Sequence, residues 1–403
     1  MRIAARRAAL ATAALAGLAF GVAVTLAVTD PRAPNRASGA EQGSGRATSS
    51  TVTEPAIEVS QRVPETLLVW TSGGLPPHFA EAVEALDGVA ELTMVRGDET
   101  GLTESRDAAG GSVDVLDAGW HLPIDTLAVE PATFAPFLTG AAADAVRGLE
   151  AGEALLTETS ARLRRLGAGA TIRLGDAEVV VTGVVDDLSG AAAELVVTEA
   201  DAGRLGVTTP RYLLVSHGGD REELQRAIAV LLGGTAVRFR SPAETTWLRH
   251  GDAVEPPSVM KVAFGEFAIR EGAGRDLAVD PAWVDRWIVT EPVPILGPVT
   301  CHRKALEPLR EAMADLEQAS LAHLVRAADF AGCFAPRRIA AGQPVSHHAW
   351  GAAVDLNVGG NPRGSFSTQD PRLVETMMRH GFTWGGTWLV PDPAHYEAPV
   401  DPR

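Results

Sequence analysis

Two short segments near the C-terminal end carry the residues whose types could do chemistry. Segment 346–355 contains His348 and Asp355, and segment 392–395 contains Asp392 and His395. Two imidazoles and one carboxylate form a ligand set for catalytic zinc, which leaves the fourth position of the metal to water. Asp392 precedes His395 by one short turn, so its carboxylate is a candidate acceptor for a proton of that water. These residues therefore predict a metallohydrolase.

The first segment follows the pattern Ser-x-His-x-x-Gly-x-Ala-x-Asp, and an acidic-x-x-His-aromatic-Glu element occupies residues 392–397. Both elements, in this order, resemble the signature of the VanX/VanY-type D-alanyl-D-alanine carboxypeptidase family of zinc peptidases. The resemblance extends upstream through residues 264–267, 299–303 and 332–337. It implies a zinc D,D-carboxypeptidase-like peptidase domain over residues 256–403, a normal size for one domain.

The resemblance implies that His348, Asp355 and His395 bind Zn²⁺ and that Asp392 is the general base. An acid inside the apolar strand expected at 352–356 would be costly to bury without a partner, and a metal removes that cost. Many members carry a glutamate where Asp392 stands, whereas the branch resembling L-alanyl-D-glutamate peptidases of phages and cell walls uses an aspartate. The shorter side chain must still reach the water.

Three further residue types near the predicted site have expected roles. Arg337 matches the arginine that, in the family, binds substrate oxygens and stabilises the developing oxyanion, since guanidinium is a permanent, fork-shaped donor. Arg338 adjoins it and stays open as an alternative. Ser346 is expected to hydrogen-bond the substrate or a ligand, because no base-and-acid pair would make it a nucleophile. His347 occupies the variable position of the pattern and is expected to be an ordinary histidine.

An exported peptidase of this kind implies peptidoglycan stem peptides as substrate. D-Ala-D-Ala carboxypeptidases, cross-bridge D,D-endopeptidases and L-alanyl-D-glutamate peptidases share the motif, so the bond that is cleaved stays open. The alternative is a non-catalytic extracytoplasmic protein in which the peptidase fold recognises a wall peptide or a protein partner.

The two cysteines, Cys301 and Cys333, both fall in the C-terminal region. An even number of cysteines in an exported chain favours a disulfide. The bridge would tie the loop before an Ala-rich helix, expected at about 305–331, to the turn after that helix. A zinc role is not expected because no CxxC or CxxH spacing accompanies them.

Export is predicted from the N-terminus. Arg2, Arg6 and Arg7 precede an uncharged run over residues 8–28, which is long enough to cross a bilayer as a helix with its N-terminus in the cytoplasm. Residues 1–28 are therefore a signal anchor or, alternatively, a cleaved signal peptide. Residues 29–64, rich in Ser, Gly, Ala, Thr and Pro, are a flexible linker. The protein is expected to be extracytoplasmic and membrane-anchored, or else secreted.

Residues 65–250 show a mixed pattern that predicts an α+β domain. Strands are expected at 66–71, 91–95, 194–198, 212–216 and 236–240, with a hairpin formed by 171–174 and 177–185; helices are expected at 76–86, 153–166 and 221–232.

The order of these elements resembles, more weakly, the MacB-like periplasmic core domain of ABC-transporter permeases. The residues that carry this resemblance are 152–156, Gly167, 175–176 and 181–185. It implies a spacer or a module that binds a protein partner. A further alternative is that this domain regulates a transporter or divisome-type complex. The predicted architecture is therefore α+β throughout, with an N-terminal membrane helix, a separate extracytoplasmic domain and the peptidase domain.

Composition limits the partners. The chain has 403 residues, enough for two or three domains, and 46% of them are hydrophobic. Its formal net charge of −16, from 35 Lys and Arg against 51 Asp and Glu, argues against a nucleic-acid partner, which requires a positive surface.

Overall fold

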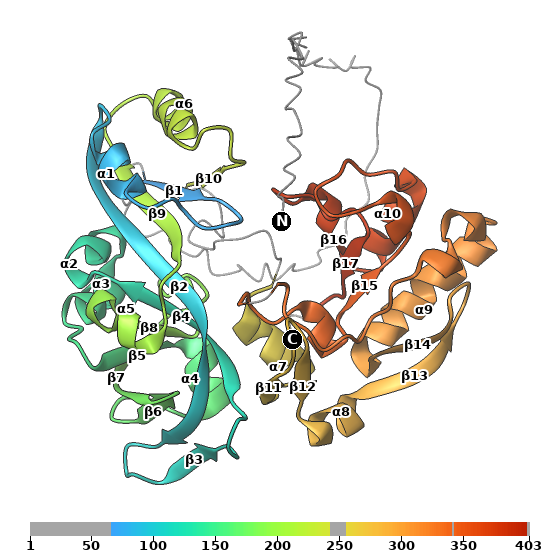
Figure 1. Cartoon of the computed structure of the whole chain (residues 1–403), viewed down its shortest axis with the longest axis horizontal. Coiled ribbons are helices and arrows are strands. Elements are labelled where there is room, and N and C mark those ends of the chain that lie inside the picture. Colours follow the sequence, from blue (N-terminus) through green and yellow to red (C-terminus); the bar gives the residue numbers. More distant parts are fainter. Residues whose placement is uncertain (1–65, 242–254, 341, 401–403) are drawn as a thin grey trace, which may run out of the picture. The chain divides into compact units, whose positions relative to one another are not determined.

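The computed structural model describes residues 66–241, 255–340 and 342–400, and residues 66–240 are built around one ten-stranded sheet. Figure 1 shows this sheet in blue to green. The strand order is β10-β1-β9-β2-β4-β8-β5-β7-β6, and β3 pairs with β2. Since β6 also pairs with β2, the strands β2, β4, β8, β5, β7 and β6 close into a ring. Closure leaves no free edge among these strands.

The elements of this part have the following bounds. The strands are β1 Thr66–Trp70, β2 Val89–Arg106, β3 Ser112–Val115, β4 Leu122–Val129, β5 Glu153–Thr157, β6 Thr171–Leu174, β7 Ala177–Val185, β8 Leu195–Thr198, β9 Pro210–His217 and β10 Arg238–Arg240. The helices are α1 Phe79–Glu84, α2 Pro131–Phe134, η1 Ala135–Phe137, α3 Gly140–Arg147, α4 Glu158–Arg164, α5 Glu199–Leu205 and α6 Arg221–Leu231.

Apolar residues on both faces of β4 explain why this strand is buried from end to end. Ile124 and Ala128 belong to a core cluster to which every strand of the ring contributes, whereas Leu127 and Val129 pack on the opposite face against residues of α2 and α3. Successive side chains of a strand point to opposite faces, so apolar residues at both odd and even positions fit a strand that is covered on both sides.

Residues 257–397 form smaller sheets packed on a separate hydrophobic core. The elements are α7 Pro257–Phe264, β11 Ile269–Glu271, β12 Leu277–Val279, α8 Pro281–Trp287, β13 Ile288–Val293, β14 Gly297–His302, α9 Arg303–Gln318, η2 Ala322–Leu324, η3 Ala327–Asp329, η4 His347–Trp350, β15 Ala353–Asp355, η5 Val358–Gly360, α10 Pro371–Arg379, β16 Thr383–Trp384, η6 Gly385–Thr387 and β17 His395–Glu397. The prediction of α+β structure is confirmed for both parts.

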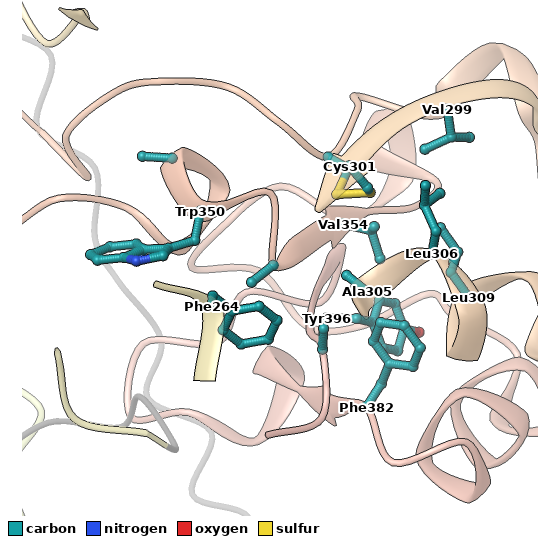
Figure 2. Packing of buried hydrophobic residues seen from close by; sticks show 14 of the residues in the cluster. Phe264, Val299, Cys301, Ala305, Leu306, Leu309, Trp350, Val354, Phe382 and Tyr396 are labelled. Atoms are coloured by element: carbon teal, nitrogen blue, oxygen red, sulfur yellow. A yellow bond between two sulfur atoms is a disulfide. The ribbon is translucent and has the colours of Figure 1, made fainter. Parts of the chain in front are cut away.

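A disulfide joins Cys301 to Cys333, as the cysteine count predicted, with 5.3 Å between the two Cα atoms. Figure 2 shows this bond within the apolar core, with Val299, Leu306 and Val354 around it. Both cysteines are buried, so the bridge is part of the core and not a surface clasp. It ties the end of β14 to the segment that runs beside β15.

Two sequence predictions about helices were wrong. Residues 153–166 are not one helix: β5 occupies 153–157 and pairs with both β7 and β8, and α4 follows. Partners far along the chain therefore override the local helical spacing. The helix expected at 305–331 ends at Gln318, where Ser320 adopts a left-handed conformation with φ 61°, and short 3-10 turns follow.

Most other predicted elements are confirmed, including the strand at 66–71, the hairpin of 171–174 with 177–185 and the helix at 221–232. The predicted membrane helix in residues 1–28 and the linker 29–64 lie outside the described residues. Across the described part of the chain, no helix combines the length and the apolar character that a bilayer span requires. The boundary between separate domains near residue 250 stays a prediction, because the described residues form one compact unit.

The two parts of this unit meet through a buried cluster of charges. Lys261 on α7 lies 2.8 Å and 2.9 Å from the two carboxylate oxygens of Glu194, which also accepts a 2.9 Å hydrogen bond from Arg164. Glu266 lies 2.6 Å from Arg164 and 3.2 Å from Lys261. The side chains of Arg164, Glu194 and Lys261 are at most 1% exposed. Two positive and two negative charges thus compensate each other at a place that is shielded from water.

Replacing Lys261 by methionine is expected to lower the free energy of unfolding by about 3–5 kcal/mol, because it leaves the buried Glu194 under-compensated. Denaturant unfolding measures this loss. Lys304→Met is the matched control, since the other lysine of the chain is exposed. Equal stability of the two variants would contradict the role given to Lys261.

Replacing Cys301 and Cys333 by serine together is expected to lower the free energy of unfolding by roughly 3–4 kcal/mol, since the bridge closes a loop of 32 residues. Thermal unfolding should show reductant lowering the stability of the wild type but not of the variant. A variant as stable as the oxidised wild type would show that the bridge has no stabilising role.

Candidate metal centre

His348, Asp355 and His395 lie together in the structure, with one ligand atom of each within 4.8 Å of the others. Nε2 of His348 lies 3.2 Å from one carboxylate oxygen of Asp355, and Nδ1 of His395 lies 2.9 Å from the other. The two imidazole rings meet edge to face at 5.1 Å. The three residues predicted as ligands thus converge on one point from three different elements.

The pairing of β15 with β17 places two of these residues side by side. The strands are antiparallel, and Asp355 lies directly opposite His395 in the register. On the other face of the same strands, Val354 and Tyr396 point into the apolar core (Figure 2). Strand alternation therefore separates the residues that hold the site from those that hold the core.

A sharp turn at Gly351 brings the third residue to the same place. His348 lies on η4, and Gly351 ends that helix with φ 62°, a left-handed conformation that glycine adopts without strain. A Cβ atom at this position would lie 2.6 Å from the backbone nitrogen of His302. The glycine of the sequence pattern thus allows the chain to reverse between His348 and Asp355.

Contacts of the ring nitrogens show which nitrogen of each ring faces the centre. Nδ1 of His348 lies 2.9 Å from the backbone carbonyl oxygen of Cys333, to which it can donate; Nε2 is buried and faces Asp355 at 3.2 Å, without the geometry of a hydrogen bond. Nε2 of His395 lies 3.5 Å from Glu397. A metal-binding histidine commonly donates its other ring N–H to a carbonyl or carboxylate. The residues present therefore fit a cation at this centre.

The electrostatics of the site favour positive charge. Burial would raise the pKa of Asp355, but His348 and His395 outweigh it and hold the pKa of this carboxyl well below its usual range. Burial likewise opposes the charged form of His395, yet Asp355 and Glu397 raise the pKa of His395 to about 10. A site that holds a proton this strongly on a buried ring also favours a metal cation there.

Asp392 lines the same cavity as the three candidate ligands, and the cavity has a volume of about 520 Å³. Its backbone N–H donates to the carbonyl of Gly385, and its own carbonyl accepts from the N–H of His395. These bonds hold the turn just before β17. Burial raises the pKa of the Asp392 carboxyl above its ordinary value, against the opposing effect of His395. A carboxylate with a raised pKa is suited to accept and return a proton.

The two adjacent arginines occupy different environments. The guanidinium of Arg337 lies 3.7 Å from Asp355 and lines the cavity, with its side chain 26% exposed. Arg338 is engaged elsewhere, since it pairs with Glu99 and Glu271. Of the two, only Arg337 is placed to meet a group bound beside the candidate ligands.

Ser346 and His347 have structural contacts in the site. The hydroxyl of Ser346 accepts a 3.4 Å hydrogen bond from the N–H of His348 and so caps η4. His347 lies 2.8 Å from Glu397, which holds both His347 and His395. Sequence reasoning assigned no role to Glu397, although it closes the second motif. Its position two residues after His395 on one strand was the available signal, because alternate residues share a face.

Comparisons with known proteins concern parts of this chain. The search among curated proteins found no relative. The periplasmic region of MacB from Actinobacillus actinomycetemcomitans is similar at 12% identity and a TM-score of 0.31, over 44% of this chain and 89% of that chain. The extracellular domain of the noncanonic ABC-type transporter YknZ from Gram-positive bacteria is similar at 13% identity and a TM-score of 0.28, over 44% and 98%. The weaker resemblance predicted from the sequence is thus found, but at such scores it says nothing about activity.

Residues 340–398 match the family described as D-alanyl-D-alanine carboxypeptidase. The matched range contains Ser346, His348, Asp355, Asp392 and His395, whereas Arg337 and both cysteines lie outside it. The resemblance predicted from the sequence is confirmed for this range. The C-terminal segment of the chain is therefore similar to D-alanyl-D-alanine carboxypeptidases.

Proposed function

We propose that the chain is a zinc-dependent peptidase that hydrolyses peptidoglycan stem peptides, as a D-alanyl-D-alanine carboxypeptidase or a related endopeptidase. The convergence of His348, Asp355 and His395 beside Asp392, within the matched range, is the observation that carries the proposal. Two imidazoles and one carboxylate are a ligand set of catalytic zinc peptidases, since they leave a position for water.

Zn²⁺ bound at these three residues would polarise a water molecule and the scissile carbonyl. Asp392 accepts the proton of the attacking water and then donates it to the leaving amine, which its raised pKa assists. Arg337 donates to the carbonyl oxygen as negative charge develops there, and its permanent charge suits this role. Cys333 and Glu397 keep the two imidazole rings in orientation.

The chain's proposed location is extracytoplasmic. Its only two cysteines form a buried disulfide, and such bonds persist in oxidising compartments and are rare in the cytosol. Anchoring through residues 1–28 and a protein partner for residues 65–250 are further parts of this proposal, which rest on the sequence.

The proposal is tested by incubating the full chain, loaded with zinc, with stem peptides and analysing the products by mass spectrometry. We expect release of an amino acid or a short peptide, which identifies the bond, and loss of this activity with a chelator. Asp392→Asn should lower kcat by about 10²–10⁴-fold while zinc binding is retained. Asp285→Asn, at an exposed site outside the cavity, is the matched control.

Zinc-dependent binding of the peptide without turnover would instead identify a recognition module. Full activity of Asp392→Asn would remove Asp392 from its proposed role. Activity that persists at full rate after complete zinc removal would contradict the proposed metal dependence.

Zinc affinity is expected to rise with pH. His395 holds a proton below its raised pKa of about 10, and it must lose that proton to act as a ligand. Between about pH 6 and 8, the zinc dissociation constant should therefore fall about tenfold per pH unit for one displaced proton. Calorimetry in buffers of different ionisation enthalpy measures both the affinity and the number of protons released. An affinity that does not change with pH would contradict this coupling.

A further inference from the structure

The hairpin from Arg337 to Ser346 joins two residues of the candidate site. The backbone N–H of Ser346 donates to the carbonyl of Arg337 at 3.0 Å, and Arg338 pairs with Val345 in an isolated antiparallel bridge. The two ends of the hairpin thus carry Arg337 and Ser346, which line the cavity, and His348 lies two residues after Ser346. The position of this hairpin, together with the isolated bridge between Arg337 and Asp276, sets where Arg337 lies relative to the candidate ligands.

A single carboxylate from the sheet region accepts hydrogen bonds from both strands of this hairpin. Glu99, on β2, accepts a 2.7 Å hydrogen bond from the guanidinium of Arg338 and a 3.0 Å hydrogen bond from the backbone N–H of Val345. Its side chain is 11% exposed. Glu99 is itself fixed, because it lies opposite Asp125 in the ladder between β2 and β4. A residue more than 200 positions away in sequence therefore holds the hairpin beside the site.

The sheet region also lines the cavity directly. Trp70, Asp98 and Arg211 belong to the same cavity wall as Arg337 and the candidate ligands. Arg211 is held by Asp125 at 2.7 Å, and Asp98 accepts backbone hydrogen bonds from two residues ahead of β9. These side chains are fixed in the sheet and are available to limit what the cavity admits.

We propose that Glu99 is a positioning residue of the peptidase, which fixes the hairpin and thereby orients Arg337 toward the substrate. This inference rests on the proposed function. It makes the sheet region a structural part of the active site, which differs from the spacer or partner-binding role that the sequence predicted. The kinetic consequence follows from geometry, because a displacement of about 1 Å at a site can cost on the order of 100-fold in rate.

The first test measures the hairpin itself in the full-length protein. Hydrogen exchange of the Val345 amide should be about tenfold or more faster in Glu99→Ala than in the wild type, since the amide loses a charged acceptor. Glu91→Ala, an exposed position on the same strand, should leave the rate unchanged. Unchanged exchange in Glu99→Ala would overturn the inference, whether or not the protein is an active peptidase.

The second test is a double-mutant cycle on stem-peptide hydrolysis. Glu99→Ala should lower kcat/KM about 100-fold. Glu99→Gln, which keeps an acceptor for Val345, should lose less, and zinc affinity should be unaffected in both. If Glu99 acts through Arg337, adding Glu99→Ala to Arg337→Ala should cost little more. Losses that multiply fully would overturn the inference. A wild type without turnover would count against the proposed function, while the exchange rate would still decide whether Glu99 positions the hairpin.

Discussion

The antiparallel pairing of β15 with β17 is the constraint on which the candidate centre depends. It sets Asp355 against His395 in the register, and it does so with two short strands of three residues each. Burying a carboxylate and an imidazole is costly unless they compensate each other or a metal. The 2.9 Å contact between Asp355 and His395 offsets part of that cost. The Nε2 atom of His348 faces the same point and makes no hydrogen bond of good geometry in the described structure.

Successive supports surround this pair. Tyr396 and Val354 anchor the two strands in the apolar core. Asp355 and His395, on the opposite face of these strands, therefore cannot shift without disturbing the packing of the core. The carbonyl of Cys333 holds the ring of His348, and the disulfide fixes Cys333 to the end of β14. A site built on strands and a disulfide-linked segment keeps its geometry better than one built on free loops.

The two parts of the described chain have separate hydrophobic cores, and charged groups make important contacts between them. Glu194 and Lys261 form one such contact deep in the structure, and Glu99 with Arg338 forms another beside the cavity. Hydrogen-bonded charges demand a particular geometry, because a small displacement leaves each of them desolvated without a partner. These contacts therefore link the sheet region to the part of the chain that carries the candidate centre.

The sequence by itself determined the α+β class, most strands and the identity of the three candidate ligands. The strands could be predicted because side-chain alternation is a local property of the chain, whereas the three ligands were implied by the resemblance of residues 346–355 and 392–397 to a family signature. It misjudged residues 153–166, because the pairing of β5 with distant strands outweighs local helical spacing. For the same reason the sequence did not predict the role of Glu99, or that the adjacent Arg337 and Arg338 have different partners. These depend on which distant residue supplies a partner charge, and only the folded chain brings those residues within hydrogen-bonding distance.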